Sequence, residues 1–224
     1  MFKPRKLYLV FMLTSMASIV AAGQSLSKTI PVRFLALGDS YTIGESVAEV
    51  QRWPVQLIHA LKKQGYTCSD PDIVAVTGWR TDDLKKGLNS GRLSSDYNLV
   101  SLLIGVNNQY QGKSVSEYER EFDGLLKMAI GHAGGDASKV FVLSIPDYGF
   151  TPFGKNRQVE ISTGIDAFNA VNETIAEKNG VTYIHITDIS RLGLKYPDLV
   201  AADGLHPSGK MYGLWVERIL EVLF

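Results

Sequence analysis

A serine hydroxyl stands at the end of an apolar run near the beginning of the chain. The run 34–37 leads directly into Gly38, Asp39 and Ser40, a pattern typical of a buried strand that turns into a helix. In an α/β sheet, a serine on such a turn presents its Oγ in the crevice beyond the carboxyl ends of the strands. The tripeptide alone also fits an ordinary helix start with a capping serine, so its chemistry depends on partners elsewhere in the sequence.

Candidate partners for this hydroxyl follow later strands and precede the last helix. Asp203 and His206 lie in the run Asp-Gly-Leu-His-Pro near the C-terminus. A neutral imidazole can accept the proton of an attacking hydroxyl, and a carboxylate can orient that imidazole. Three N–H donors, the backbones of Ser40 and Gly78 and the amide of Asn107, could stabilise a developing oxyanion. These residue types together indicate acyl transfer with a serine nucleophile.

The order of these blocks resembles the SGNH hydrolases, also called GDSL esterases and lipases. The matching pieces are Gly-Asp-Ser, an isolated glycine after the second strand, Gly-x-Asn after the third and Asp-x-x-His near the C-terminus, and they span residues 35–207. The resemblance implies a flavodoxin-like sheet and an ester hydrolase that works through an acyl-enzyme. It implies that Ser40 is the nucleophile, His206 the base and Asp203 its partner. It also implies an oxyanion hole made by Ser40, Gly78 and Asn107.

Two residues depart from the family pattern. Tyr41 follows the Gly-Asp-Ser tripeptide where leucine is frequent, at a position that varies. Asn108 stands where the third block commonly has an aspartate. Because the oxyanion donor is Asn107, we expect activity to survive, while the hydrogen bonds of the missing carboxylate to neighbouring backbone lack an obvious replacement. Asn108 itself is interpreted as a turn residue.

Apolar runs alternate with amphipathic segments along the chain, which predicts a parallel sheet with helices on both faces. Strands are expected at 33–37, 72–76, 99–104, 140–145 and 181–186, giving a five-stranded, three-layer α/β/α sandwich. Helices are expected from 52 to a stop at 65, over 81–88, after a capping box at 114, from 161 to a stop at 179–180, and after 208. The segment 147–160 lacks periodicity and is predicted to be a long loop at the same sheet edge. One domain, 32–224, would follow a linker at 24–31.

The first 23 residues have the pattern of a secretory signal peptide. Basic residues at positions 3, 5 and 6 precede an apolar run over 7–20 and small residues at 21–23. We expect cleavage near Ala22 or Gly23. The apolar run is shorter than the ~20 residues that a membrane-spanning helix needs, so the sequence predicts a secreted or periplasmic protein with no stable membrane span in its mature chain.

Composition argues against several other classes of function. The 224 residues, 45% hydrophobic and 21% charged, suffice for one domain with a substantial core. All 23 acidic residues follow position 23 and no basic cluster occurs, which argues against nucleic-acid binding. A single cysteine, Cys68, allows no internal disulfide and is expected to be half-buried. The sequence lacks metal-ligand spacing, a phosphate-loop lysine and a dinucleotide-binding glycine motif, so neither a metal nor a cofactor is predicted.

Aromatic side chains follow several predicted strands and could line a substrate pocket or pack as loop staples. The candidates are Trp79, Tyr110, Tyr148 and Phe150, with Arg80 and Phe153 beside them. Three other histidines are interpreted as structural or solvated: His185, which alternates within a strand and precedes Asp188, and His59 and His132, on or after helices.

The expected substrates are small or medium acyl esters, including O-acetylated glycans and lipids. Two alternatives remain open on the sequence. One is an acyltransferase that uses the same triad, in which an alcohol replaces water. The other is a non-catalytic carbohydrate-binding protein of the same fold. Nothing in the sequence predicts an oligomeric state.

Overall fold

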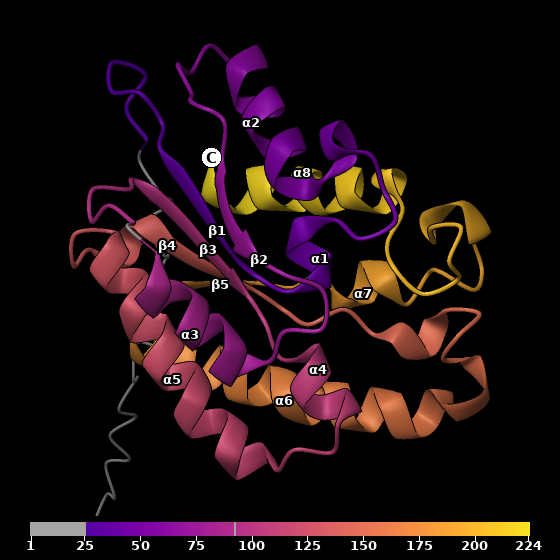
Figure 1. The fold of residues 1–224 in the computed structure, drawn as a ribbon. Coiled ribbons are helices and arrows are strands. Elements are labelled where there is room, and N and C mark those ends of the chain that lie inside the picture. The colour runs from indigo at the N-terminus through magenta and orange to yellow at the C-terminus, as the bar shows by residue number, and fades with distance from the viewer. Residues whose placement is uncertain (1–25, 92) are drawn as a thin grey trace, which may run out of the picture.

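The computed structural model describes residues 26–91 and 93–224, so the predicted signal peptide lies outside the described residues. Five parallel strands form one sheet in the order β2-β1-β3-β4-β5, with helices on both faces (Figure 1). This strand order is the flavodoxin-like doubly wound order. The predicted three-layer α/β/α sandwich with a five-stranded parallel sheet is confirmed.

The strands differ in burial according to their place in the sheet. Their bounds are β1 (Phe34–Gly38), β2 (Asp72–Ala75), β3 (Leu99–Leu103), β4 (Val140–Leu143) and β5 (Thr182–Ile184). β1, β3 and β4 are buried along their whole length, which is why they read as continuous apolar runs. In register, Gly38 pairs with Ala75 of β2 and with Leu103 of β3. The three strands therefore end together, and the residues that follow them share one edge of the sheet.

Two groups of helices cover the sheet. α2 (Trp53–Lys63) and α8 (Gly209–Leu223) pack together on one face, while α3 (Thr81–Ser90), α5 (Val115–His132) and α6 (Gln158–Lys178) lie on the other (Figure 1). Large aromatic side chains fill both interfaces. Trp53 packs within 5.9 Å of Phe34 on the first face, and Tyr118 within 4.4 Å of Phe168 on the second, between ring centroids. Such aromatic side chains contribute much of the buried apolar area of a core.

A helix start at Ser40 was expected, but the other short helices at the strand ends were not predicted. α1 (Ser40–Ile43), α4 (Val106–Tyr110) and α7 (Thr187–Ser190) follow β1, β3 and β5. A helix of one turn has too few residues to show a hydrophobic period. The predicted loop 147–160 instead contains two 3-10 helices, η3 (Tyr148–Phe150) and η4 (Lys155–Arg157), and α6 already begins at Gln158.

Residues 26–31, the part of the predicted linker that the structure describes, contact the domain. Leu26 packs against the core, Lys28 Nζ donates to Gln64 O at 2.9 Å, and Val32 forms a parallel bridge with the half-buried Cys68. Within residues 26–91 and 93–224, no helix is long and apolar enough to cross a membrane.

Candidate active site

Ser40 is the first residue of α1, directly beyond the end of β1. The side chain of Asp39 caps this helix, because its Oδ1 accepts a hydrogen bond from Tyr41 N at 3.1 Å. Gly38 is required at the turn, since a Cβ there would overlap the side chain of Thr42 and the carbonyl of Leu103. Backbone crowding and the cap together fix the position of Ser40 at the sheet edge.

Asp39 itself is almost completely enclosed. It is 1% exposed, and this burial raises the pKa of its carboxyl to about 7, against hydrogen bonds that favour the ionised form. Asp39 does not line the pocket that contains Ser40. Its position is that of a cap for α1, next to Ser40.

Asp203 and His206 form a tight turn before α8. Asp203 Oδ2 lies 2.6 Å from His206 Nδ1, and Oδ1 accepts from Leu205 N at 2.9 Å and from His206 N at 3.0 Å. Gly204, with φ of 73°, permits the turn. Because Nδ1 donates to the carboxylate, Nε2 is the proton acceptor of the neutral ring.

The charge on Asp203 is stabilised by its surroundings. Partial burial opposes ionisation, but hydrogen bonds from Ser46 Oγ, His206 Nδ1 and the two backbone N–H groups outweigh it. They hold the pKa of Asp203 well below its usual value of 3.8. At neutral pH the side chain is therefore a carboxylate that can orient His206.

One pocket brings together the residues that follow β1 and the turn that precedes α8. It has a volume of about 280 Å³ and is lined by Ser40, Tyr41, Val106, Asn107, Tyr110, Tyr148, Phe153, Leu205 and His206. The ring of Tyr41 stands edge-on to the ring of His206 at 6.0 Å. No hydrogen bond joins Ser40 Oγ to His206 within the described part of the chain. Their shared pocket is the placement that the strand-end reasoning required.

Asn107 and Gly78 lie at the neighbouring strand ends. Asn107 lies on α4 and lines the pocket, and its Nδ2 donates to Trp79 O at 2.9 Å. An amide nitrogen carries two hydrogens, so one remains for a ligand. Gly78, with φ of 85°, precedes Trp79, and its N–H has no acceptor among the described residues. Gly105, with φ of 129°, starts α4 where a Cβ would lie 2.5 Å from Tyr118 Oη.

Comparison with known proteins places the chain in a family. Residues 36–214 match the GDSL-like Lipase/Acylhydrolase family. The chain belongs to this family. It is accordingly a carboxylic ester hydrolase of the GDSL type.

Solved structures share the fold of this GDSL hydrolase at low sequence identity. TesA is 18% identical with a TM-score of 0.67, covering 85% of this chain and 97% of that one. The acetylxylan esterase Axe2 from Geobacillus stearothermophilus is 19% identical (TM-score 0.65, covering 86% and 94%). A lipase/acylhydrolase from Enterococcus faecalis is 22% identical (TM-score 0.63, covering 85% and 94%). A search of curated proteins found no match.

Asn108 of this GDSL hydrolase is a buried link between two helices, so its interpretation as a turn residue is wrong. It is 1% exposed; its Oδ1 accepts from Thr81 N at 3.1 Å, and its Nδ2 donates to Thr81 Oγ1 at 2.6 Å. The Thr81 hydroxyl in turn donates to the carboxylate of Glu121. Since that hydroxyl has a single proton, it must accept from position 108. The amide of Asn108 can donate to this hydroxyl. An ionised Asp at position 108 could not, and its carboxylate oxygen would face the Thr81 oxygen with no proton between them.

Asn108→Asp is therefore expected to destabilise the protein at neutral pH, although it restores the residue common in the family. We expect a loss of about 1–3 kcal/mol in the free energy of unfolding, the cost of an unsatisfied buried acceptor. Urea unfolding at pH 7 measures it. Glu121→Gln, whose amide can donate to Thr81 Oγ1, should recover most of the loss in the double variant. A more stable Asn108→Asp protein, or additive effects of the two changes, would contradict the network.

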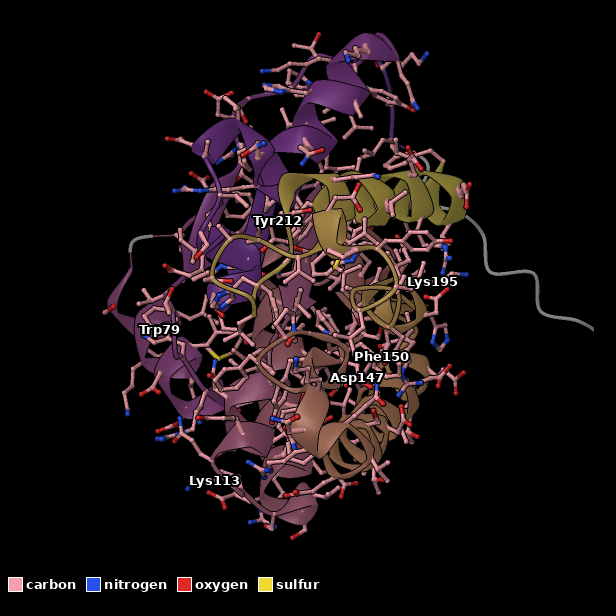
Figure 2. The ribbon with its side chains drawn as sticks, turned by 90° about the vertical axis from the view of Figure 1, so that its right-hand side faces the viewer. Trp79, Lys113, Asp147, Phe150, Lys195 and Tyr212 are labelled. Atoms are coloured by element: carbon pink, nitrogen blue, oxygen red, sulfur yellow. The ribbon has the colours of Figure 1, made fainter. Side chains whose placement is uncertain are left out.

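The aromatic candidates divide into two groups. Tyr110, Tyr148 and Phe153 line the pocket, with ring centroids 6.1–6.4 Å apart. Trp79 and Phe150 do not line it and lie on different parts of the molecule (Figure 2). Trp79 covers Gly87 of α3, where a Cβ would lie 2.5 Å from its ring. The guanidinium group of Arg191 lies over the ring of Phe150, 5.9 Å from the ring centroid.

A buried carboxylate that the sequence analysis did not single out supports the pocket wall. Asp147 accepts from Arg191 Nε at 3.0 Å, from Ser162 Oγ at 2.6 Å and from Gly149 N at 2.9 Å. Figure 2 shows Asp147 beside Phe150. These contacts fix η3, and thereby Tyr148, whose hydroxyl donates to Gln109 Oε1 at 2.9 Å.

The remaining histidines lie away from the pocket. His185 is exposed with Nε2 3.1 Å from Glu173 Oε1, and Asp188 pairs instead with Arg218 at 3.0 Å. His59 is exposed, as expected. His132 is not simply solvated, because it is half-buried with Nδ1 2.9 Å from Ser94 O. The described residues contain no group of three or more His, Cys, Asp or Glu side chains arranged to hold a metal ion.

Proposed function

We propose that this chain is a serine esterase that acts through an acyl-enzyme on small or medium acyl esters. The observation that carries the proposal is the shared pocket of Ser40 and His206, with the imidazole held by the Asp203 carboxylate at 2.6 Å. Ser40 Oγ attacks the ester carbonyl while His206 Nε2 takes its proton. The alcohol then leaves with that proton, and water, activated by the same imidazole, attacks the acyl-Ser40 ester to release the acid.

The oxyanion of both tetrahedral intermediates needs donors that are in place before the reaction. The free N–H of Gly78, the second Nδ2 hydrogen of Asn107 and the N–H of Ser40 are proposed to supply them. A donor of this kind contributes about 10²–10³ in rate. The hydrogen bond from Asn107 to Trp79 O holds the amide beside the turn of Gly78, which supports a common target for the two donors.

The lining of the pocket indicates the substrate class. No Asp, Glu, Lys or Arg side chain is among its described lining residues, so a neutral ester fits better than a phosphorylated or carboxylated one. Tyr110 and Phe153 are 55% and 54% exposed at the pocket and can contact either an acyl chain or the face of a sugar ring. Short acyl esters of neutral alcohols, O-acetylated glycans included, are the proposed substrates.

A series of p-nitrophenyl esters from acetyl to palmitoyl tests this proposal. We expect acetyl or butyryl esters to be hydrolysed with a kcat/KM at least about tenfold above that of palmitoyl, because a pocket of about 280 Å³ cannot hold the whole of a long chain. An acetylated polysaccharide measured in parallel tests the glycan substrate, and an added alcohol acceptor separates hydrolysis from acyl transfer. Absence of turnover on every ester, with no labelling of Ser40 by a fluorophosphonate, would overturn the proposal.

A further inference from the structure

The segment that follows α1 has an unusual backbone. Gly44 ends α1 in a left-handed conformation with φ of 74°, and Ser46, two residues later, has φ of 65°. Ser46 is the one non-glycine residue with positive φ among residues 26–91 and 93–224. This conformation is strained for an L-residue, because its Cβ lies close to the following carbonyl oxygen. Strain of this kind persists where contacts hold it and clusters at functional sites.

The contact that holds Ser46 is a hydrogen bond to the triad carboxylate. Ser46 Oγ donates to Asp203 Oδ2 at 2.5 Å, onto the same oxygen that faces His206 Nδ1 at 2.6 Å. The other oxygen is occupied by the backbone of Leu205 and His206. In the described part of the chain, Ser46 is thus the donor to Asp203 that comes from outside the 203–206 turn.

The same segment is tied to the nucleophile and to the opposite strand end. Glu45 N donates to Ser40 O at 3.0 Å, and the Glu45 carboxylate accepts from the hydroxyl of Thr77, the residue before Gly78. Residues 44–46 therefore connect the backbone that carries Ser40 with Asp203 on one side and with the turn of Gly78 on the other. A movement of Asp203 relative to Ser40 has to break the Ser46 contact.

We propose that Ser46 is a positioning residue, which rests on the proposed esterase function. Its hydroxyl sets the rotation of the Asp203 carboxylate and through it the plane of the His206 ring relative to Ser40. Ser46 is not among the residues that line the pocket, so it has no direct contact with the ester. An O–H···O⁻ hydrogen bond is short and strong, and a small misplacement of a catalytic group can cost about 10²-fold in rate.

Three substitutions at this position separate the hydroxyl from the backbone strain. Ser46→Thr keeps the hydroxyl and adds strain, Ser46→Ala removes the hydroxyl and keeps the strain, and Ser46→Gly removes both. We expect kcat of the Thr variant within about threefold of wild type, and kcat of both other variants about 10- to 100-fold lower at unchanged KM. The rate at which a fluorophosphonate labels Ser40 should fall in the same order. The free energy of unfolding should be higher for Gly than for Ala.

The role of Ser46 is decided by comparing the ranking of the three variants in kcat with their ranking in unfolding free energy. A kcat that follows stability, with Gly fastest and Thr slowest, or a wild-type kcat in both the Ala and Gly variants, would overturn the inference. If the Thr protein does not fold, a wild-type kcat in the more stable Gly variant is by itself enough to overturn the inference. Failure of the esterase proposal looks different, because the wild-type protein would then neither hydrolyse esters nor take the label.

Discussion

Replacing Ser40 with alanine is expected to lower kcat for ester hydrolysis about 10⁶-fold, as loss of a triad serine does in a comparable hydrolase. The covalent route disappears with the hydroxyl, and only binding and the oxyanion donors remain to assist attack by water. The fold should be unaffected, because Asp39, not Ser40, caps α1. We expect the free energy of unfolding to change by less than about 0.5 kcal/mol, since alanine suits the first turn of a helix.

Turnover of an acetyl ester and covalent labelling by a fluorophosphonate measure this effect independently. Wild-type protein should gain the mass of one phosphonyl group, and the Ser40→Ala protein none. Ser116→Ala, an exposed serine on α5, is the matched control and should behave as wild type. An active or labelled Ser40→Ala protein would show that another residue is the nucleophile, and the proposed mechanism would fall.

The part of the site that sequence could predict follows from the sheet. β1 and β3 read as buried apolar runs, and parallel strands must end at one edge, so Ser40 and Asn107 were expected together there. His206 is predicted to join them because Asp203, three residues earlier in the same turn, can orient its imidazole. In the structure, Ser40, Asn107 and His206 line one pocket, and Asp203 is hydrogen-bonded to His206. This arrangement follows from the sheet topology and does not depend on details of side-chain packing.

Other parts of the site had no local signal. The roles of Asn108 and Ser46 depend on hydrogen bonds to Thr81 and Asp203, 27 and 157 residues away along the chain. A serine or an asparagine shortly after a glycine is typical of a turn, and this pattern alone predicts a turn at Asn108. Aromatic residues posed a similar problem, because Trp79 and Tyr110 both follow strand ends, and only packing against Gly87 distinguishes the first. Contacts between distant segments had to come from the structure.

Asp203→Asn is expected to reduce kcat about 10⁴-fold, because a neutral amide cannot hold His206 in the reactive tautomer. The carboxylate accepts four hydrogen bonds, two on each oxygen: from Ser46 Oγ and His206 Nδ1 on Oδ2, and from the backbone N–H groups of Leu205 and His206 on Oδ1. An asparagine has one acceptor oxygen. If this oxygen keeps the backbone donors, the amide N–H₂ faces Ser46 and His206 Nδ1. Nδ1 must then accept, so Nε2 carries the ring proton and cannot take one from Ser40.

The pH dependence of stability gives this variant a second signature. Because the pKa of Asp203 is held below its usual value of 3.8, the carboxylate stabilises the folded state above that value, and this contribution is lost as pH falls through the folded pKa. The difference in unfolding free energy between wild type and Asp203→Asn should therefore be largest at neutral pH and shrink below about pH 4. Urea unfolding at pH 7 and pH 3 measures it.

Asp198→Asn, an exposed acid paired with Lys210, is the matched control, and its own difference should stay within about 0.5 kcal/mol. A pH-independent difference at position 203, or an Asp203→Asn protein with wild-type kcat, would show that the carboxylate does not hold the imidazole.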